Sequence, residues 1–373
     1  MTCWIQFGDL HACEGDGWES LELFARLVEE ANRLRPGAVD FAVLPGDNAN
    51  HATEEQFHRI AAVAGRLALP LHVLPGDHDF EAGSLDTFRA LLAPAPLPRL
   101  EHIAGARCLF LDIVSAGSGG PDFRLGARQM AWLRRQLAED PGDAPTLVFM
   151  HAFPCDLTEG GDSVARAFAE AGVAYVGTGH THYNDLLNDG AVIYGATRST
   201  GEIEEAGGAG FSLSALDGDV LSWRFKALDA PWPFVLVTSP ADHRLATDIQ
   251  SRTQIPEEGF EVRARVFAAD PPRHVEARLG DAPPRRMTSE DGLRWTARFD
   301  GVADGLHRLA VTAIGTDGQA DTDRIEVLVR RGRERPKRRP IVAPGHDVHS
   351  VRAWPEHGIP GGQLGPNRNG GKW

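Results

Sequence analysis

The sequence of 373 residues predicts an α/β fold of layered sheets and helices, followed by a small antiparallel β-sandwich. Up to about residue 226, short apolar runs alternate with amphipathic segments, which is typical of a layered α/β core. Beyond Pro256 the apolar runs are short, alternating and divided by Gly, Pro and Asp, as in antiparallel sheets. We therefore expect a first domain, a linker, a β-sandwich and a tail at 1–228, 229–255, 256–330 and 331–373.

Six short apolar runs in the first domain, several of them rich in β-branched residues, are expected to form buried strands at 3–7, 41–44, 71–74, 108–114, 146–150 and 173–176. Five segments between them carry apolar residues at helical spacing, which predicts helices at 20–34, 54–67, 85–92, 127–137 and 163–171. A further strand is expected at 193–195. Two more, at 211–216 and 220–225, are expected to form a hairpin that turns at Asp217 and Gly218.

The second domain is predicted to contain five alternating strands, which favours a sandwich of the immunoglobulin-like type, with strands at 260–268, 274–279, 293–299, 305–313 and 325–329. The following tail is basic at first and then rich in Gly and Pro. One interpretation is a solvated, flexible tail. The alternative is a tail that docks on its own or a neighbouring subunit, because Trp354 and Trp373 are costly to leave in water.

Composition narrows the class of protein. The apolar fraction of 42% and the charged fraction of 24% are typical of a soluble globular protein. A formal net charge of −14 argues against a nucleic-acid partner and against binding to anionic membranes. We see no secretory signal and no apolar run of roughly 18 residues, and the four cysteines lack CxxC spacing. These features predict a cytoplasmic protein with reduced thiols.

Five short polar motifs each follow one of the apolar runs of the first domain: Asp9-Leu-His11, Gly46-Asp47, Gly76-Asp77-His78-Asp79, His151 and Gly179-His180-Thr181-His182. In layered α/β folds, ligands gather beyond the carboxyl ends of the strands, where these motifs are expected to lie. Carboxylates together with imidazoles suit Mn, Fe, Zn or Co better than a dedicated Ca or Mg cage. The set therefore predicts a site for two divalent transition metals.

Each motif also has a simpler interpretation when it is taken alone. Asp9 and Asp47 could cap the helices that follow the strands. His151 lies among apolar residues and could be a hydrogen-bonded core histidine. The occurrence of all five motifs in this order favours the metal site.

The ordered motifs resemble those of the calcineurin-like metallophosphoesterase superfamily, and among them the class III cyclic-nucleotide phosphodiesterases. Members of that superfamily carry D-x-H, G-D, G-N-H-[DE], a lone H and G-H-x-H in this order. The resemblance covers roughly residues 1–226. It implies a four-layer α/β/β/α sandwich with a dinuclear metal centre that one Asp bridges.

The resemblance also implies a role for each matching position. The first metal would be bound by Asp9, His11 and His182, and Asp47 would bridge both metals. The second metal would be bound by His151 and His180. His78 would lie beside the scissile phosphate, and Asp79 would orient His78 or couple to its charge.

One position departs from the family pattern. Asp77 stands where the family has an Asn ligand of the second metal. A carboxylate can ligate as well as an amide oxygen, but it adds one negative charge. We therefore expect tighter binding of the second metal and a preference for singly charged phosphodiesters over doubly charged monoesters.

Two further residues are candidates for contacts with substrate. Asn48 follows Asp47 and could line the pocket, although Asn after Asp is also ordinary turn chemistry. Arg198 follows a late strand and could bind a phosphate through both of its guanidinium nitrogens, with a surface salt bridge as the alternative.

The predicted function is hydrolysis of a small-molecule phosphodiester, in which a metal-bridging hydroxide attacks phosphorus and His78 assists. Mn or Fe is favoured among the metals. One alternative is a phosphomonoesterase that acts on a nucleotide or sugar phosphate. Another is a non-catalytic scaffold whose metals stabilise a protein-binding surface. A homo-oligomer is compatible with the sequence, and no membrane association is expected.

Overall fold

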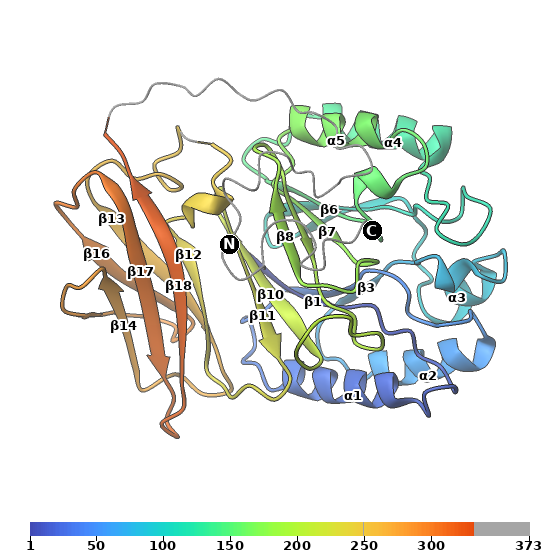
Figure 1. Ribbon diagram of the computed structural model, residues 1–373, viewed down its shortest axis with the longest axis horizontal. Helices are drawn as coiled ribbons and strands as arrows, with labels where there is room; N and C mark the ends of the chain where they lie inside the picture. The colour runs from blue at the N-terminus through green and yellow to red at the C-terminus, as the bar shows by residue number, and fades with distance from the viewer. Residues whose placement is uncertain (249, 332–373) are drawn as a thin grey trace.

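The computed structural model describes residues 1–248 and 250–331, and these contain two facing β-sheets between two layers of helices. Figure 1 shows α1 and α2 below the sheets and α4 and α5 above them, with β12 to β18 forming a separate body at the left. The first part of the chain therefore has the four-layer α/β/β/α arrangement that the resemblance implies. The predicted tail at 331–373 lies outside the described residues except for Arg331.

The first sheet has five strands in the order β11-β10-β1-β2-β3. The strands β1 (Thr2–Phe7), β2 (Phe41–Leu44) and β3 (Leu71–Val73) are parallel neighbours. β1 also pairs antiparallel with β10 (Gly210–Asp217), which forms a hairpin with β11 (Val220–Ala227). Every residue of β1 is buried, because β1 lies inside a sheet that is covered on both faces.

The second sheet has six strands in the order β4-β5-β6-β7-β9-β8. Its parallel centre contains β5 (Ala106–Phe110), β6 (Thr146–Phe149), β7 (Tyr175–Thr178) and β9 (Ile193–Ala196). Its edge strands β4 (Arg99–Ile103) and β8 (Asp185–Asn188) pair antiparallel and were not predicted. β4 is half-buried and polar, and β8 is short, so neither forms the apolar run that identifies a central strand.

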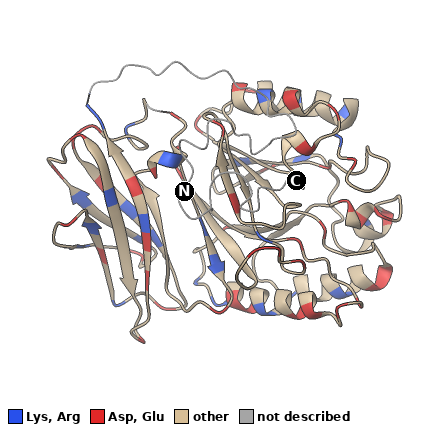
Figure 2. Cartoon of the chain, in the orientation of Figure 1, with Lys and Arg blue, Asp and Glu red and all other residues tan. Residues whose placement is uncertain are grey.

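The helices cover the outer faces with their apolar stripes. α1 (Glu19–Asn32) and α2 (Glu54–Ala64) belong to one layer, and α4 (Gly126–Ala138) and α5 (Gly161–Glu170) to the other. The short α3 (Asp86–Leu91) contacts α2. In α1 the buried apolar residues follow helical spacing: Leu21, Phe24, Leu27, Val28 and Ala31. Acidic and basic residues occur along these helices (Figure 2).

Aromatic side chains fill the space between the two sheets. The ring of Trp4 on β1 lies 6.1 Å from Phe41 in its own sheet, and 6.2 Å from Phe149 and 5.2 Å from Tyr175 in the facing sheet. The amide of Gln6 donates across the same gap to the carbonyl of Thr178 at 2.8 Å. These contacts between the sheets fix the position of one sheet relative to the other.

A β-sandwich follows, built from a three-stranded sheet in the order β12-β13-β16 and a four-stranded sheet in the order β15-β14-β17-β18. Its strands are β12 (Phe234–Ser239), β13 (Phe260–Phe267), β14 (His274–Leu279), β15 (Arg285–Arg286), β16 (Arg294–Phe299), β17 (Gly305–Ile314) and β18 (Ala320–Val329). All pairings within the two sheets are antiparallel. Its immunoglobulin-like type stays a prediction.

The predicted linker at 229–255 is wrong in one respect, because it contains the sandwich strand β12. Phe234 and Leu236 point into the core of the first domain, whereas Val235 and Val237 point into the core of the sandwich. The carboxylates of Asp321 and Asp323 accept hydrogen bonds at 2.7 Å from the backbone N–H groups of Val235 and Val237, respectively. The strand is thus enclosed from both sides and joins the two bodies.

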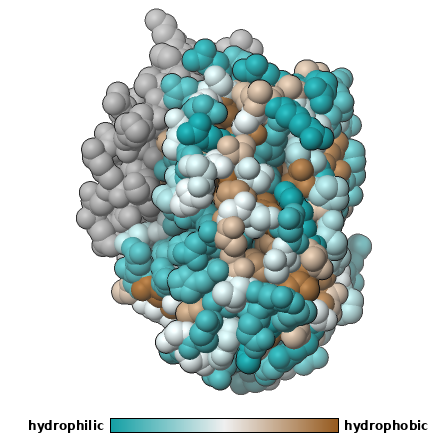
Figure 3. Space-filling model, turned by 90° about the vertical axis from the view of Figure 1, so that its right-hand side faces the viewer, coloured by the Kyte–Doolittle hydropathy of each residue, from teal (hydrophilic) through white to brown (hydrophobic). Residues whose placement is uncertain are grey.

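The surface of the described residues has few large apolar side chains. Among the described residues, Leu306 is the one large hydrophobic residue with an exposed side chain, and it is 53% exposed. On the face at the right of Figure 1, apolar residues lie in small groups among hydrophilic ones (Figure 3). Within the described ranges, every helix is too short or too polar to cross a bilayer.

Candidate metal centre

The predicted site residues come together at one edge of the two sheets. Each of the five motifs follows the carboxyl end of a parallel strand: β1, β2 and β3 in the first sheet, and β6 and β7 in the second. The two sheets face each other, so polar side chains from both converge at this edge.

Seven of these side chains form two groups that share one carboxylate. The ligand atoms within each group lie within 4.8 Å of one another, and the groups are Asp9, His11, Asp47 and His182, and Asp47, Asp77, His151 and His180. We call them the first and the second group. Each contains two carboxylates and two imidazoles, and Asp47 belongs to both.

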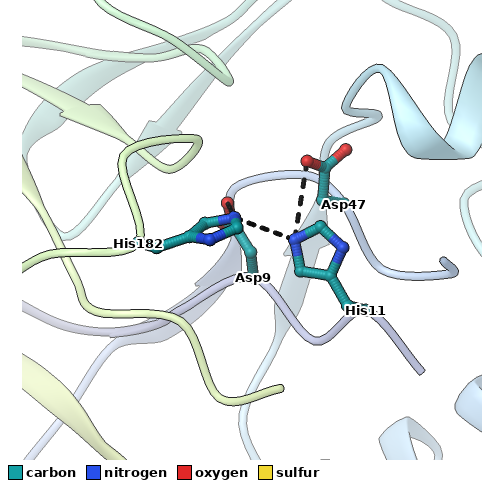
Figure 4. A group of neighbouring side chains, drawn as sticks. All are labelled: Asp9, His11, Asp47 and His182. Atoms are coloured by element: carbon teal, nitrogen blue, oxygen red, sulfur yellow. Dashed lines mark hydrogen bonds and ion pairs between the residues drawn. The ribbon is translucent and has the colours of Figure 1, made fainter. Parts of the chain in front are cut away.

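In the first group, two imidazoles point toward each other beside two carboxylates (Figure 4). Nε2 of His11 lies 2.9 Å from Nε2 of His182 and 3.8 Å from Oδ2 of Asp47. Nε2 of His182 lies 3.8 Å from Oδ2 of Asp9. The other oxygen of Asp9, Oδ1, is buried and has no hydrogen-bond partner among the described residues.

In the second group, His151 lies between two carboxylates. Its Nε2 atom is 3.3 Å from Oδ2 of Asp47 and 3.2 Å from Oδ1 of Asp77. Nδ1 of His180 lies 3.7 Å from the same Asp77 oxygen. The ring of Phe123 packs edge-on against both imidazoles, with centroid distances of 5.6 Å to His151 and 4.8 Å to His180.

The backbone at the site adopts conformations that side chains usually avoid. Four site residues have positive φ angles, namely His11 at 45°, Asp47 at 47°, His180 at 66° and His182 at 60°. Non-glycine residues rarely adopt such angles, and they cluster at functional sites when the surrounding structure enforces them. The strain at His180 and His182 also turns two alternating residues toward the same cluster.

Two motif glycines are required by close packing against the ligands. A Cβ atom at Gly76 would collide with the carboxylate of Asp47, and one at Gly179 would collide with the carboxylate of Asp9. Each of these two glycines therefore leaves room for a carboxylate side chain that comes from a different motif.

Burial and charge shift the ionisation of the cluster. Burial raises the pKa of Asp9 to about 7, against the opposing charge of His151. Burial would also raise the pKa of Asp47, but the charge and hydrogen bond of His151, together with His11, hold it below its ordinary range. Burial would lower the pKa of His151, but Asp47 and Asp77 outweigh it and the pKa lies well above its usual value.

The residues of both groups fit divalent cations. Three buried carboxylates converge with four imidazoles. The Oδ1 atom of Asp9 is buried, and no described residue donates a hydrogen bond to it. A buried oxygen of this kind normally has a hydrogen bond or coordinates a cation. Carboxylate oxygens and imidazole nitrogens are the donors that Mn, Fe, Zn and Co accept.

The prediction that Asp79 orients His78 is wrong. Nδ1 of His78 lies 2.8 Å from the backbone oxygen of Asn50, and no hydrogen bond in the described residues joins the two side chains. Asp79 instead accepts hydrogen bonds from the backbone N–H groups of Asn48, Ala49 and Gly76, at 2.9 to 3.2 Å. It therefore holds together the loops after β2 and β3.

Burial and neighbouring charges also shift the ionisation of His78 and Asp79. Burial, followed by the charge of Asp47, raises the pKa of Asp79 to about 6. Burial would lower the pKa of His78, but the charge of Asp47 and the hydrogen bond to Asn50 raise it above its ordinary value. Asp47, not Asp79, is the carboxylate that acts most strongly on His78.

Asn48 is fully buried and serves the same loops. Its amide nitrogen donates at 2.8 Å to the carbonyl of Leu74 and to a carboxylate oxygen of Asp79. Its side-chain oxygen is buried without a hydrogen-bond partner among the described residues. A direct contact between Asn48 and substrate stays a prediction.

The guanidinium of Arg198 is engaged within the protein, so a contact with a substrate phosphate stays a prediction. The side chain is only 10% exposed, and Nε donates to Glu205 at 2.8 Å. Nη1 donates to the carbonyl of Gly208 at 3.1 Å, and the guanidinium stacks over the ring of Phe225 at 4.6 Å. Arg198 therefore anchors the loop that follows β9.

Replacing Arg198 by lysine should reduce stability without impairing substrate binding. A lysine cannot reproduce the three contacts of the guanidinium, so Glu205 loses a buried partner. We expect the free energy of unfolding to fall by about 1–3 kcal/mol, with KM for a phosphodiester unchanged. Urea denaturation and steady-state kinetics measure the two effects. A large rise in KM at unchanged stability would instead support the predicted contact between Arg198 and substrate.

Sequence reasoning missed two acidic residues at the first group. Glu202 and Glu204 lie in the loop after β9, within 4.0 Å of the imidazoles of His11 and His182. The local sequence, Gly-Glu-Ile-Glu-Glu, has no periodicity or metal-ligand spacing, so nothing in it indicates this position. The loop reaches the site because it connects β9 of the second sheet to β10 of the first sheet.

Two facing mixed sheets with a pair of Asp/His groups at their carboxyl edge define the metallophosphoesterase fold. Residues 5–184 match the family model described as calcineurin-like phosphoesterase. All seven residues of the two groups lie within the matched range.

Two curated relatives show the same similarity over part of their length. The chain is 35% identical to the glycerophosphodiester phosphodiesterase GpdQ of Enterobacter lignolyticus (strain SCF1), over 36% of this chain and 48% of the relative. It is 29% identical to the 3',5'-cyclic adenosine monophosphate phosphodiesterase CpdA of Escherichia coli (strain K12), over 37% of this chain and 47% of the relative. The chain thus spans about half the length of these relatives.

Among solved structures, the purple acid phosphatase PPD1 from yellow lupin seeds is similar, with 13% sequence identity and a TM-score of 0.47. The similarity covers 61% of this chain and 51% of that chain.

Proposed function

We propose that this protein hydrolyses a small-molecule phosphodiester with the help of two divalent cations held by the first and second groups. The observation that carries the proposal is that Asp47 belongs to both groups, whose ligand atoms lie within 4.8 Å of one another. A carboxylate shared in this way suits two cations at short separation. The names of both relatives, which are phosphodiesterases, support a diester as the substrate.

Each set of residues has a distinct task in this reaction. Two divalent cations, when bound, polarise the phosphoryl oxygens and activate a water molecule. Asp9, His11 and His182 would hold one of them, and Asp77, His151 and His180 the other. The mixture of carboxylate and imidazole donors favours Mn or Fe, with Zn and Co also accepted.

His78 would hold the proton that the leaving oxygen needs. Its Nδ1 atom lies against the carbonyl of Asn50, which leaves Nε2 as the ring nitrogen for the transfer. Its ring lies 4.6 Å from that of His11, and its backbone N–H donates to Asp47 at 2.9 Å. These contacts with His11 and with the shared Asp47 support His78 as the proton donor.

Removal of the cations should abolish activity. We expect a chelator followed by dialysis to reduce hydrolysis of bis-p-nitrophenyl phosphate to background, and added Mn²⁺ to restore it. At about 100 times its Kd, Mn²⁺ should also stabilise the fold by about 2.7 kcal/mol per site, which thermal denaturation detects. Turnover that survives the chelator would contradict the proposal. Silence on every mono- and diester tried would favour the non-catalytic scaffold.

A cytoplasmic location and a homo-oligomer stay predictions from the sequence. In the described residues the four cysteines are free, and their reduced state stays a prediction.

A further inference from the structure

The loop after β9 is fastened to the chain segments that supply the first group. The backbone N–H groups of Thr200 and Gly201 donate to the carbonyl of Asp9 at 2.8 and 3.3 Å, and the hydroxyl of Ser199 donates to the same carbonyl at 2.9 Å. The N–H of Ser199 donates to the carbonyl of His182 at 3.3 Å. One end of the loop is therefore attached by hydrogen bonds to the backbone of Asp9 and His182.

The other end of the loop is held by Glu205. Its carboxylate accepts hydrogen bonds from Nε of Arg198 at 2.8 Å and from the backbone N–H of Asn184 at 2.9 Å. The N–H of Glu202 donates to the hydroxyl of Ser199 at 2.8 Å. The segment that carries Glu202 and Glu204 is thus attached on both sides.

Glu202 and Glu204 lie against the first-group imidazoles. Oε1 of Glu204 is 3.4 Å from Nδ1 of His182, and its Oε2 accepts a hydrogen bond from the hydroxyl of Tyr183 at 2.9 Å. The two oxygens of Glu202 lie 3.7 Å from Nδ1 of His182 and 4.0 Å from Nδ1 of His11.

The ring atoms involved are those that face away from the group. His11 and His182 approach each other through their Nε2 atoms, at 2.9 Å. An oxygen acceptor beside Nδ1 favours the tautomer with a proton on Nδ1, which leaves the Nε2 lone pair directed into the group. For His11 the hydrogen-bond partner of Nδ1 is the side-chain oxygen of Asn50, at 3.2 Å, and Glu202 adds a negative charge at 4.0 Å.

We propose that Glu202 and Glu204 are positioning residues of the first group. They fix the tautomer and orientation of His182, and more weakly of His11, and so raise the affinity of the first group for a divalent cation. The second group is not affected, because His151 and His180 contact Asp77 instead. This inference rests on the proposed function, since it requires that the groups bind cations.

The test is a Mn²⁺ titration of the full chain, followed by electron paramagnetic resonance of free Mn²⁺. The native protein should bind two ions. In the Glu202→Ala/Glu204→Ala double variant, one of the two dissociation constants should rise by about 10–100-fold, and the other should not change. The Glu202→Gln/Glu204→Gln variant retains oxygen acceptors and should recover most of the lost affinity. The two single Ala variants should show that Glu204 contributes more.

A matched control and a second measurement separate positioning from a general structural effect. Glu81→Ala removes a carboxylate of similar exposure (52%) from a histidine outside both groups, His51, at 3.0 Å, and should leave both constants unchanged. Nitrogen-15 NMR of cation-free protein should show His182 with its proton on Nδ1 in the native chain and a mixture of tautomers in the double Ala variant.

The outcomes distinguish this inference from the proposed function. If the native chain binds two Mn²⁺ ions and the double Ala variant binds both with native affinity, the positioning role is refuted while the metal centre stands. Equal weakening of both constants would refute the selectivity for the first group. A native chain that binds no Mn²⁺ would overturn the inference together with the proposed function.

Discussion

Replacing Asp47 by asparagine is expected to eliminate most activity and at least one of the two cation sites. Asp47 is the carboxylate common to both groups, so the variant removes a negative charge from each at once. Its other contact, with the backbone N–H of His78 at 2.9 Å, can persist through the amide oxygen. Turnover of bis-p-nitrophenyl phosphate should therefore fall by about 10²–10³-fold, the loss typical of removing one preorganised electrostatic group.

The measurement combines kinetics with Mn²⁺ stoichiometry, which should fall from two ions per chain to one or none. Asp323→Asn is the matched control, because Asp323 is also a buried carboxylate but belongs to the sandwich, where it binds the N–H of Val237. That variant should alter stability and leave cation binding intact. Native turnover with two bound ions in Asp47→Asn would refute the shared role of Asp47.

The second large effect is expected for Asp77→Asn, which should change substrate preference rather than simply reduce activity. Asp77 contributes one of the three carboxylates of the two groups, so the substitution makes the centre less negative by one charge. Two unit charges 4 Å apart interact by about 4 kcal/mol at an effective dielectric constant of 20. Even after strong screening, a doubly charged monoester should gain more from the substitution than a singly charged diester.

We expect the ratio of kcat/KM for bis-p-nitrophenyl phosphate to that for p-nitrophenyl phosphate to fall by roughly tenfold or more. Both substrates should be measured at saturating Mn²⁺, so that altered cation affinity does not contribute. Asp77→Glu keeps the charge but changes the geometry, and it should lower turnover of both substrates while retaining the native ratio. An unchanged ratio in Asp77→Asn would show that this charge does not select the substrate.

The metal-binding groups could be predicted from the sequence because each motif is local. Gly46-Asp47 and Gly179-His180-Thr181-His182 each follow a buried apolar run directly, and parallel strands deliver their carboxyl ends to one edge. The glycines in these motifs then reflect close packing between motifs, as Gly179 against Asp9 illustrates. A pattern of this kind is readable without knowledge of the tertiary structure.

The partners of individual side chains could not be predicted in the same way. Adjacency in sequence favoured Asp79 as the partner of His78, but the two residues lie in a tight turn, η1 (His78–Phe80), where successive side chains point in different directions. Arg198 follows a strand near the site, yet Glu205, seven residues further along, engages its guanidinium. Both sets of contacts arise where a loop folds back on itself.

The same limit applies to the boundary between the two bodies. β12 lies between two prolines in a segment whose composition indicates a linker, and its burial on both faces depends on packing from the first domain and from the sandwich. The backbone groups of its edge are satisfied by Asp321 and Asp323, more than 80 residues later. The sequence around β12 does not indicate contacts with residues so far along the chain.

The sequence by itself determined the kinds of donor, their order and the strands that carry them, because hydrophobic periodicity and turn chemistry act over a few residues. Only the tertiary structure decided which atoms of those donors face one another. His11 and His182 are 171 positions apart and meet at 2.9 Å, while Glu202 and Glu204 reach the same imidazoles from a loop with no distinguishing pattern. Contacts of that range follow from the packing of two sheets, which no single segment specifies.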